Sequence, residues 1–227
     1  MSGLFTSEQI RDALLELGRR LDARGHRADL YIVGGAAMAL AFDRTRVTRN
    51  IDAVFAPKTV VYDVARAMAE ESADLDENWL NDAVKGFLSA TADDDATVFM
   101  EEKGIRVLVA SPKRLLAMKV FAARADRDRD DIVSLCTRIG VGSIQEVLDM
   151  TADIYGDLLT PKIRFIVIEL LQDILPMEAL SVVPVNPGGV ANSSCSMVFH
   201  GPECANPEGP RTRWGSSPNA SALVLSP

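Results

Sequence analysis

A pair of glycines that closes a short apolar run constrains this chain more than any other feature. The run LYIV at 30–33 is rich in β-branched and aromatic residues, which favours a strand. Gly34 and Gly35 follow, and the small, apolar residues 36–42 predict a short helix packed closely on a sheet. Such a turn offers backbone N–H groups and the positive end of a helix dipole, with no Cβ to block a phosphate. Alone, a glycine pair is a weak signal, because ordinary strand-to-helix turns also use one.

A second predicted strand, IDAVF at 51–55, follows with polar residues on one face. Asn50 and Asp52 are two positions apart, so on a strand their side chains project together. Two aspartates there would chelate Mg²⁺, a hard ion that takes oxygen ligands and shares them with nucleotide phosphates. Asn50 supplies a neutral oxygen instead, which should lower the affinity for metal. Nearby bases favour an anionic ligand: Arg44, Arg46, Arg49 and Lys58.

The order of helical and strand patterns predicts an α+β fold, with a small mixed sheet flanked by helices and then a C-terminal helical bundle. Besides the elements above, a hairpin is expected from the runs at 96–100 and 105–110. Helices are expected at 6–24, 58–72, 77–89, 112–124, 127–139, 143–154 and 160–175. We therefore divide the chain into an α/β core at 1–110, a helical part packed on it at 111–180, and a tail at 181–227.

The tail differs sharply in composition. It is rich in proline, glycine and serine and has no hydrophobic periodicity, which is typical of disorder. Its abrupt onset also fits an extension unrelated to the domain, for instance one translated from a different reading frame.

Charge and hydropathy exclude several classes of protein. The net charge of −8 argues against general coating of nucleic acid, although bases dominate residues 103–129 and acids dominate 63–102. No run of 18 apolar residues is present, so a membrane span is not expected. The first 20 residues resemble an amphipathic helix and not a signal peptide, which predicts a cytoplasmic protein.

Two longer stretches carry a resemblance to a known family. VGGAAMALAFDRTRVTRNIDAVF at 33–55 is similar to the nucleotidyltransferase superfamily, in which a strand–helix glycine motif precedes a D-x-D pair. Within it, the stretch resembles bacterial domains of the AbiEii and MenT toxin group. SPKRLLAMKVFAARADRDRDDIVSL at 111–135 is similar to that group's lysine-bearing helix and the R-D-x-x-D motif after it.

The resemblance implies a role for each matching residue near the phosphates. Gly34 and Gly35 would hold the β- and γ-phosphates of a nucleoside triphosphate (NTP). Asp52 would bind Mg²⁺, with Asn50 at the other metal position. Lys119 would bind a phosphate and neutralise the leaving pyrophosphate.

The same resemblance assigns the remaining charged residues. Asp131, alone or with Asp128, would complete the polar centre as metal ligand, base or orienter of the lysine. Arg46 and Arg49 would steer the triphosphate or an RNA acceptor. The third acid that many superfamily enzymes carry is missing, because the strand IRVLV offers Arg106.

The implied activity is Mg²⁺-dependent transfer of a nucleotidyl group from an NTP to an acceptor hydroxyl. In the toxin group the acceptor is often the 3′ end of tRNA, and a cognate antitoxin protein is a further expected partner. Asn50 leaves three explanations open: a tolerated variant, a degenerate non-catalytic domain, or a deliberate inactivation. The alternative functions are therefore a pseudoenzyme that binds a nucleotide or a partner without turnover, and a generic α+β domain in which the motif is coincidental.

Overall fold

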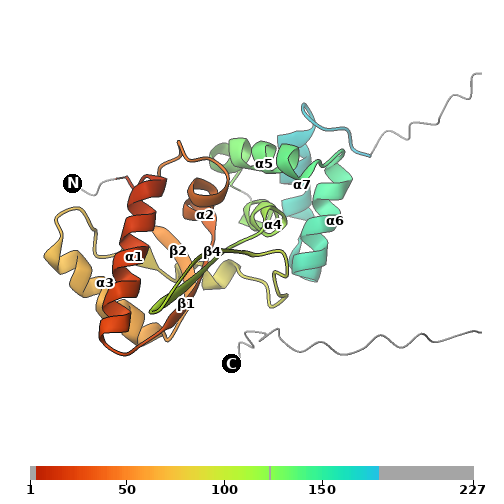
Figure 1. Cartoon of the computed structure of the whole chain (residues 1–227). Helices are drawn as coiled ribbons and strands as arrows, with labels where there is room; N and C mark the ends of the chain where they lie inside the picture. Colours follow the sequence, from red (N-terminus) through yellow and green to blue (C-terminus); the bar gives the residue numbers. More distant parts are fainter. Residues whose placement is uncertain (1–3, 123, 179–227) are drawn as a thin grey trace, which may run out of the picture. The chain divides into compact units, whose positions relative to one another are not determined.

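A five-stranded mixed sheet lies between the helices of the fold (Figure 1). The computed structural model describes residues 4–122 and 124–178, all within one compact unit. The strand order is β3-β2-β1-β5-β4. β1 is antiparallel to β2 and parallel to β5, so the mixed sheet of the predicted α+β class is confirmed. The strands are β1 (Ala28–Ile32), β2 (Ile51–Ala56), β3 (Leu80–Asn81), β4 (Thr97–Glu102) and β5 (Ile105–Val109).

Helix α1 (Ser7–Ala23) packs on the sheet through a stripe of leucines and small residues. Its start is fixed by a capping box, in which the Thr6 hydroxyl accepts from the Gln9 N–H and the Gln9 side chain accepts from the Thr6 N–H. The buried stripe recurs at helical spacing: Ile10, Leu14, Leu17 and Leu21. Gly18 lies on the same face, directly over Ile105 of β5. The helix predicted at 6–24 is thus confirmed.

Helix α3 (Lys58–Glu71) lies beside α1 and contacts β2. The Phe55 and Tyr62 rings meet edge to face with their centroids 5.0 Å apart. Phe55 is the cross-strand partner of Leu30, and Ala28, on the same face of β1 as Leu30, is the partner of Ile105 under α1. Helices α1 and α3 therefore share one face of the sheet. Asp52 has the opposite parity on β2 and therefore projects from the other face.

The helix predicted at 77–89 is wrong. Residues Leu80–Asn81 form the edge strand β3, parallel to β2, and Ala83–Phe87 form the short 3₁₀ helix η1. Two adjacent buried residues explain the difference. Trp79 is fully buried and its indole N–H donates to the Ala65 carbonyl 3.1 Å away, while Leu80 is buried in the sheet. The segment therefore pairs with β2 instead of coiling.

The C-terminal helices pack on one another, as predicted. Helix α4 (Pro112–Ala122) contacts α5 (Ala125–Ile139), α6 (Ile144–Tyr155) and α7 (Pro161–Leu171), and these four gather to one side of the strands in Figure 1. The remaining elements are helix α2 (Gly34–Ala41) and the turn η2 (Gly156–Leu158). Within residues 4–122 and 124–178, no helix combines the length and apolarity that a membrane crossing requires. The expected tail at 181–227 lies outside the described residues.

Helix α1 approaches the β4–β5 turn so closely that Gly104 leaves no room for a side chain. A Cβ at Gly104 would overlap the Gly18 carbonyl oxygen and lie 2.7 Å from the Asp22 backbone nitrogen. We expect Gly104→Ala to lower the free energy of unfolding by about 1–3 kcal/mol, the usual range for overpacking, in urea denaturation. Gly142→Ala is the control, because a Cβ there meets only the Glu146 carboxylate at 3.8 Å. Equal stability of both variants would contradict the packing described.

Candidate active site

A cleft of about 790 Å³ collects nearly all the residues that the sequence singled out. It is bounded by the start of α2, the segment before β2, η1, α4 and the start of α5. Asp131 is the one predicted residue that lies behind its wall. The predicted residues along the wall are Gly34, Gly35, Arg46, Arg49, Asn50, Asp52, Lys119 and Asp128.

The glycine pair forms the start of α2, and the backbone conformation of Gly34 would be strained for a residue with a side chain. Gly34 has φ +64°, and a Cβ there would lie 3.3 Å from Asp52 Oδ2. A Cβ at Gly35 would lie 3.0 Å from the Thr48 hydroxyl. The N-cap residue, Val33, provides no side-chain cap. The backbone N–H groups of the first turn are thus open to an anion.

Asp52 lies on β2 beside this helix start. Its carbonyl accepts from the Val33 N–H at 3.0 Å, which holds the two motifs side by side. Asn50 Nδ2 donates to Asp52 Oδ1 over 3.1 Å, so the expected pairing of the two side chains is present. Burial raises the pKa of Asp52 above its ordinary value, although hydrogen bonds from Asn81 and Asn50 oppose the shift. The positive charges of Arg124 and Arg127 oppose it further.

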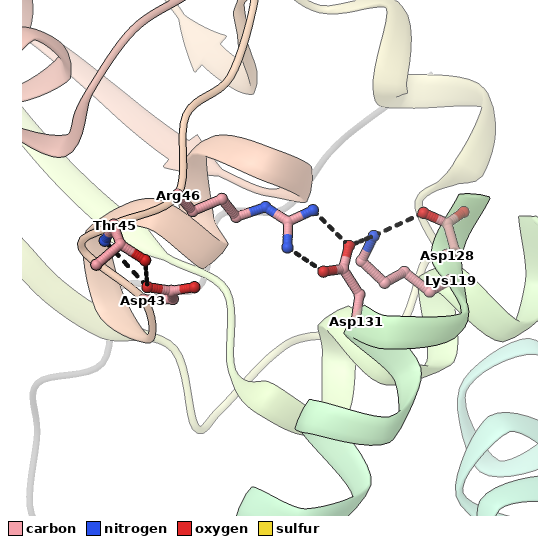
Figure 2. Close-up of polar contacts among 6 residues, drawn as sticks. All are labelled: Asp43, Thr45, Arg46, Lys119, Asp128 and Asp131. Carbon is pink, nitrogen blue, oxygen red and sulfur yellow. Dashed lines mark hydrogen bonds and ion pairs between the residues drawn. The ribbon is translucent and has the colours of Figure 1, made fainter.

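Asp131 joins the two halves of the site through a buried ion-pair network (Figure 2). Arg46, from the α2–β2 loop, donates both terminal nitrogens to the Asp131 carboxylate, with Nη2 2.7 Å from Oδ2. Lys119 Nζ approaches from the other side, 2.5 Å from Asp131 Oδ2 and 2.8 Å from Asp128 Oδ1. The Asp131 side chain is only 5% exposed. Asp131 therefore orients both cations, while Asp128 and Lys119 face the cleft.

The electrostatics of the wall favour an anionic ligand. Five bases line it against two acids, and one of these acids, Asp128, is already paired with Lys119. The bases are Arg46, Arg49, Lys119, Arg124 and Arg127. Low-dielectric clefts lined by one sign of charge concentrate counter-ions of the other sign. Polyphosphate suits this cleft better than a neutral ligand does.

The oxygen donors of the cleft fit Mg²⁺ only in company with a ligand. Among the described residues, no three His, Cys, Asp or Glu side chains are grouped to hold a metal ion. Asp52 offers one carboxylate, and Asn50 stands beside it with its amide turned to donate. Mg²⁺ is commonly held by one or two carboxylates together with substrate phosphates. The donors thus fit an ion that completes its coordination with oxygens of a bound ligand.

Two residues at or beside the cleft were missed because residues 77–89 were expected to form a helix. Asn81 of β3 pairs with Asp52 across the strands, and Phe87 ends η1 on the cleft wall. Arg124 lines the wall at the start of α5, with its guanidinium over the Phe87 ring, 5.8 Å from the centroid. The basic run at 103–129 signalled the arginine. No sequence signal marked the phenylalanine.

The raised pKa of Asp52 predicts a cost in stability. A carboxyl whose pKa is raised on folding stabilises the fold below its unfolded pKa, near 3.8, and that contribution is lost as pH rises through the folded pKa. We expect Asp52→Asn to raise the melting temperature at pH 7, and the gain to vanish below pH 3.8. Exposed Asp63→Asn is the control. A lower melting temperature for Asp52→Asn at pH 7 would contradict the burial argument.

Comparison with known proteins identifies the family. Residues 11–166 match the model of a family described as "Nucleotidyltransferase of unknown function (DUF6036)". A solved structure, that of an antigenic nucleotidyltransferase-like protein from Paracoccidioides brasiliensis, is similar at 16% identity and a TM-score of 0.43, over 76% of this chain and 91% of that one. No curated protein sequence matches the chain. The family model spans most of the chain, which therefore belongs to the DUF6036 family of nucleotidyltransferases.

Proposed function

We propose that this chain moves a nucleotidyl group from an NTP to an acceptor hydroxyl. The observation that carries the proposal is the convergence in one cleft of an uncapped helix start at Gly34 and Gly35, the carboxylate of Asp52 and the amine of Lys119. Phosphoryl-type transfer needs mainly positioning and neutralisation of charge. These groups supply both. The family supports a transferase in general terms.

The proposed transfer is an in-line displacement at the α-phosphorus. The acceptor oxygen attacks the α-phosphorus and forms a P–O bond, while the α-phosphorus–oxygen bond to the β-phosphate breaks and pyrophosphate leaves with the electron pair. Lys119 has three N–H donors. Two of them serve Asp128 and Asp131, so the third remains for a phosphate oxygen. Asp128, the carboxylate on the cleft wall, is our candidate to accept the hydroxyl proton.

Mg²⁺ is part of the proposal because the donor set fits a nucleotide-borne ion. Asp52 would hold it, next to Asn50. The bound ion would neutralise charge on the triphosphate. Gly34 and Gly35 would contribute backbone N–H groups to the same phosphates, and Arg46 and Arg49 would attract the nucleotide.

The acceptor that we favour is RNA, with the 3′ end of tRNA as the first candidate. Arg49, Arg124 and Arg127 on the cleft wall suit its phosphates. This assignment follows the resemblance to bacterial toxins of toxin–antitoxin systems. The same resemblance implies an activity in the cytoplasm that an antitoxin protein controls.

One observation favours a second function. Asn50 replaces the first metal-binding acid and donates its amide hydrogen to Asp52, so the pair carries a single negative charge. A chain with this site can bind a nucleotide and fail to turn it over. The alternative is therefore a pseudoenzyme that binds a nucleotide or a partner protein.

A labelling experiment separates the two functions. The full chain is incubated with Mg²⁺, each α-³²P-labelled NTP and bulk tRNA. We expect label in RNA from the native sequence, none from Asp52→Ala, and about 10²–10³-fold less from Lys119→Met, the usual loss when a transition-state donor is removed. Lys113→Met is the matched control, because Lys113 is an exposed residue of the same helix outside the cleft wall.

The Asn50→Asp variant decides what the asparagine means. Label from the native sequence would show that Asn50 is tolerated. Label only after Asn50→Asp would show a site silenced at one residue. Nucleotide binding without label from any variant would contradict the transferase and support the pseudoenzyme.

A further inference from the structure

We infer that Phe87 and Arg124 form a platform on which an unpaired nucleobase stacks. The inference rests on the proposed function for its class of ligand and adds the part of the cleft that would hold the base. Phe87 is 39% exposed although it lines the cleft, and Leu4 and Val47 are likewise exposed apolar side chains on the same wall. Phosphate and metal alone would not contact exposed apolar side chains, so these side chains favour a ligand with an apolar part.

The backbone of Phe87 is fixed while its ring stays accessible. Its carbonyl accepts from the Tyr155 hydroxyl at 2.6 Å, and the Tyr155 ring stacks on Phe121 with centroids 4.2 Å apart. Two residues further on, the Ser89 hydroxyl donates to the Ile154 carbonyl at 2.6 Å. The exposed ring therefore belongs to an anchored segment, which lowers the ordering cost of binding.

The other end of η1 is anchored as well. The Asp82 carboxylate, just before η1, accepts from the Tyr62 hydroxyl at 2.6 Å and lies 2.6 Å from Lys58 Nζ. Burial alone would raise the pKa of Asp82, but hydrogen bonds from Lys58, Tyr62 and Lys85 outweigh burial and lower the pKa to about 2. Asp82 is thus ionised at neutral pH and ties η1 to α3.

Arg124 adds a planar cation to the ring. Its guanidinium lies over the ring of Phe87, 5.8 Å from the centroid, within cation–π range. Proteins hold unpaired bases by stacking them on aromatic rings and on arginine planes, with positive charge for the neighbouring phosphates. The platform shares its cleft with Gly34 and Lys119, so the base and the phosphates of one ligand can be held together.

The base can come from the donor nucleotide or from the end of an acceptor RNA, and calorimetry on the full chain separates the two. The ligands are each Mg·NTP, inorganic tripolyphosphate with Mg²⁺, and a short single-stranded RNA. The variants are Phe87→Ala and Phe87→Trp. Phe165→Ala is the matched control, since Phe165 is an exposed phenylalanine of α7 (62%) outside the cleft wall.

We expect Phe87→Ala to weaken either the NTPs or the RNA by about 5- to 150-fold, the usual effect of losing one stacked base. Tripolyphosphate should bind equally to the native chain and to Phe87→Ala. Phe87→Trp and Phe165→Ala should bind like the native chain. A loss confined to NTPs assigns the base to the donor, and a loss confined to RNA assigns it to the acceptor.

Two results would overturn the platform. In the first, Phe87→Ala leaves both NTP and RNA affinities unchanged, which would free the ring for contact with a partner protein. In the second, tripolyphosphate is weakened as much as NTPs, which would mean general damage to the cleft. The labelling experiment separates this inference from the proposed function. An NTP or RNA effect at Phe87 in a chain that never transfers label would keep the platform and reject the transferase.

Discussion

The site depends on one buried carboxylate. Asp131 accepts from Arg46, in the loop that leads to β2, and from Lys119, on a helix of the C-terminal group. Removing one partner of a buried ion pair costs about 3–5 kcal/mol, a large share of the roughly 5–15 kcal/mol that stabilises a typical domain. The contact therefore joins the sheet to the helices and also determines where the lysine amine lies. Through it, the α2–β2 loop and the lysine of α4 are held at the same cleft.

The cleft gives up stability for an arrangement that suits anions. Gly34 adopts a left-handed conformation beside Asp52, where any side chain would crowd the carboxylate. Asp52 itself is held in a buried environment that disfavours its charge. Helix α2 begins without a side-chain cap, and several positively charged arginines lie together on the cleft wall. Each feature is unfavourable in the free protein, and each would become favourable with the proposed polyphosphate and its cation bound.

Local sequence patterns predicted most of the helices and strands, and eight of the nine residues expected at the site line the cleft. The apolar stripe of α1, the glycine turn and the β4–β5 hairpin are encoded by neighbouring residues, so periodicity and turn chemistry identify them. The failure at 77–89 has a tertiary cause. Trp79 and Leu80 are buried against β2 and α3, and this tertiary packing overrides a helical pattern. That error hid Asn81 and Phe87, while the contact of Asp131 with Arg46 could be recognised only in the folded chain.

A crystal structure of the full chain with Mg²⁺ and an NTP analogue that carries an α,β-methylene bridge tests the central claim most directly. We predict phosphates against the backbone N–H groups of Gly34 and Gly35 and against Lys119 Nζ. We also expect the contacts of Asp131 with Arg46 and Lys119 to persist, and the base to lie at Phe87 if the donor supplies it. A nucleotide bound outside this cleft, or phosphates remote from Asp52 and Lys119, would contradict it.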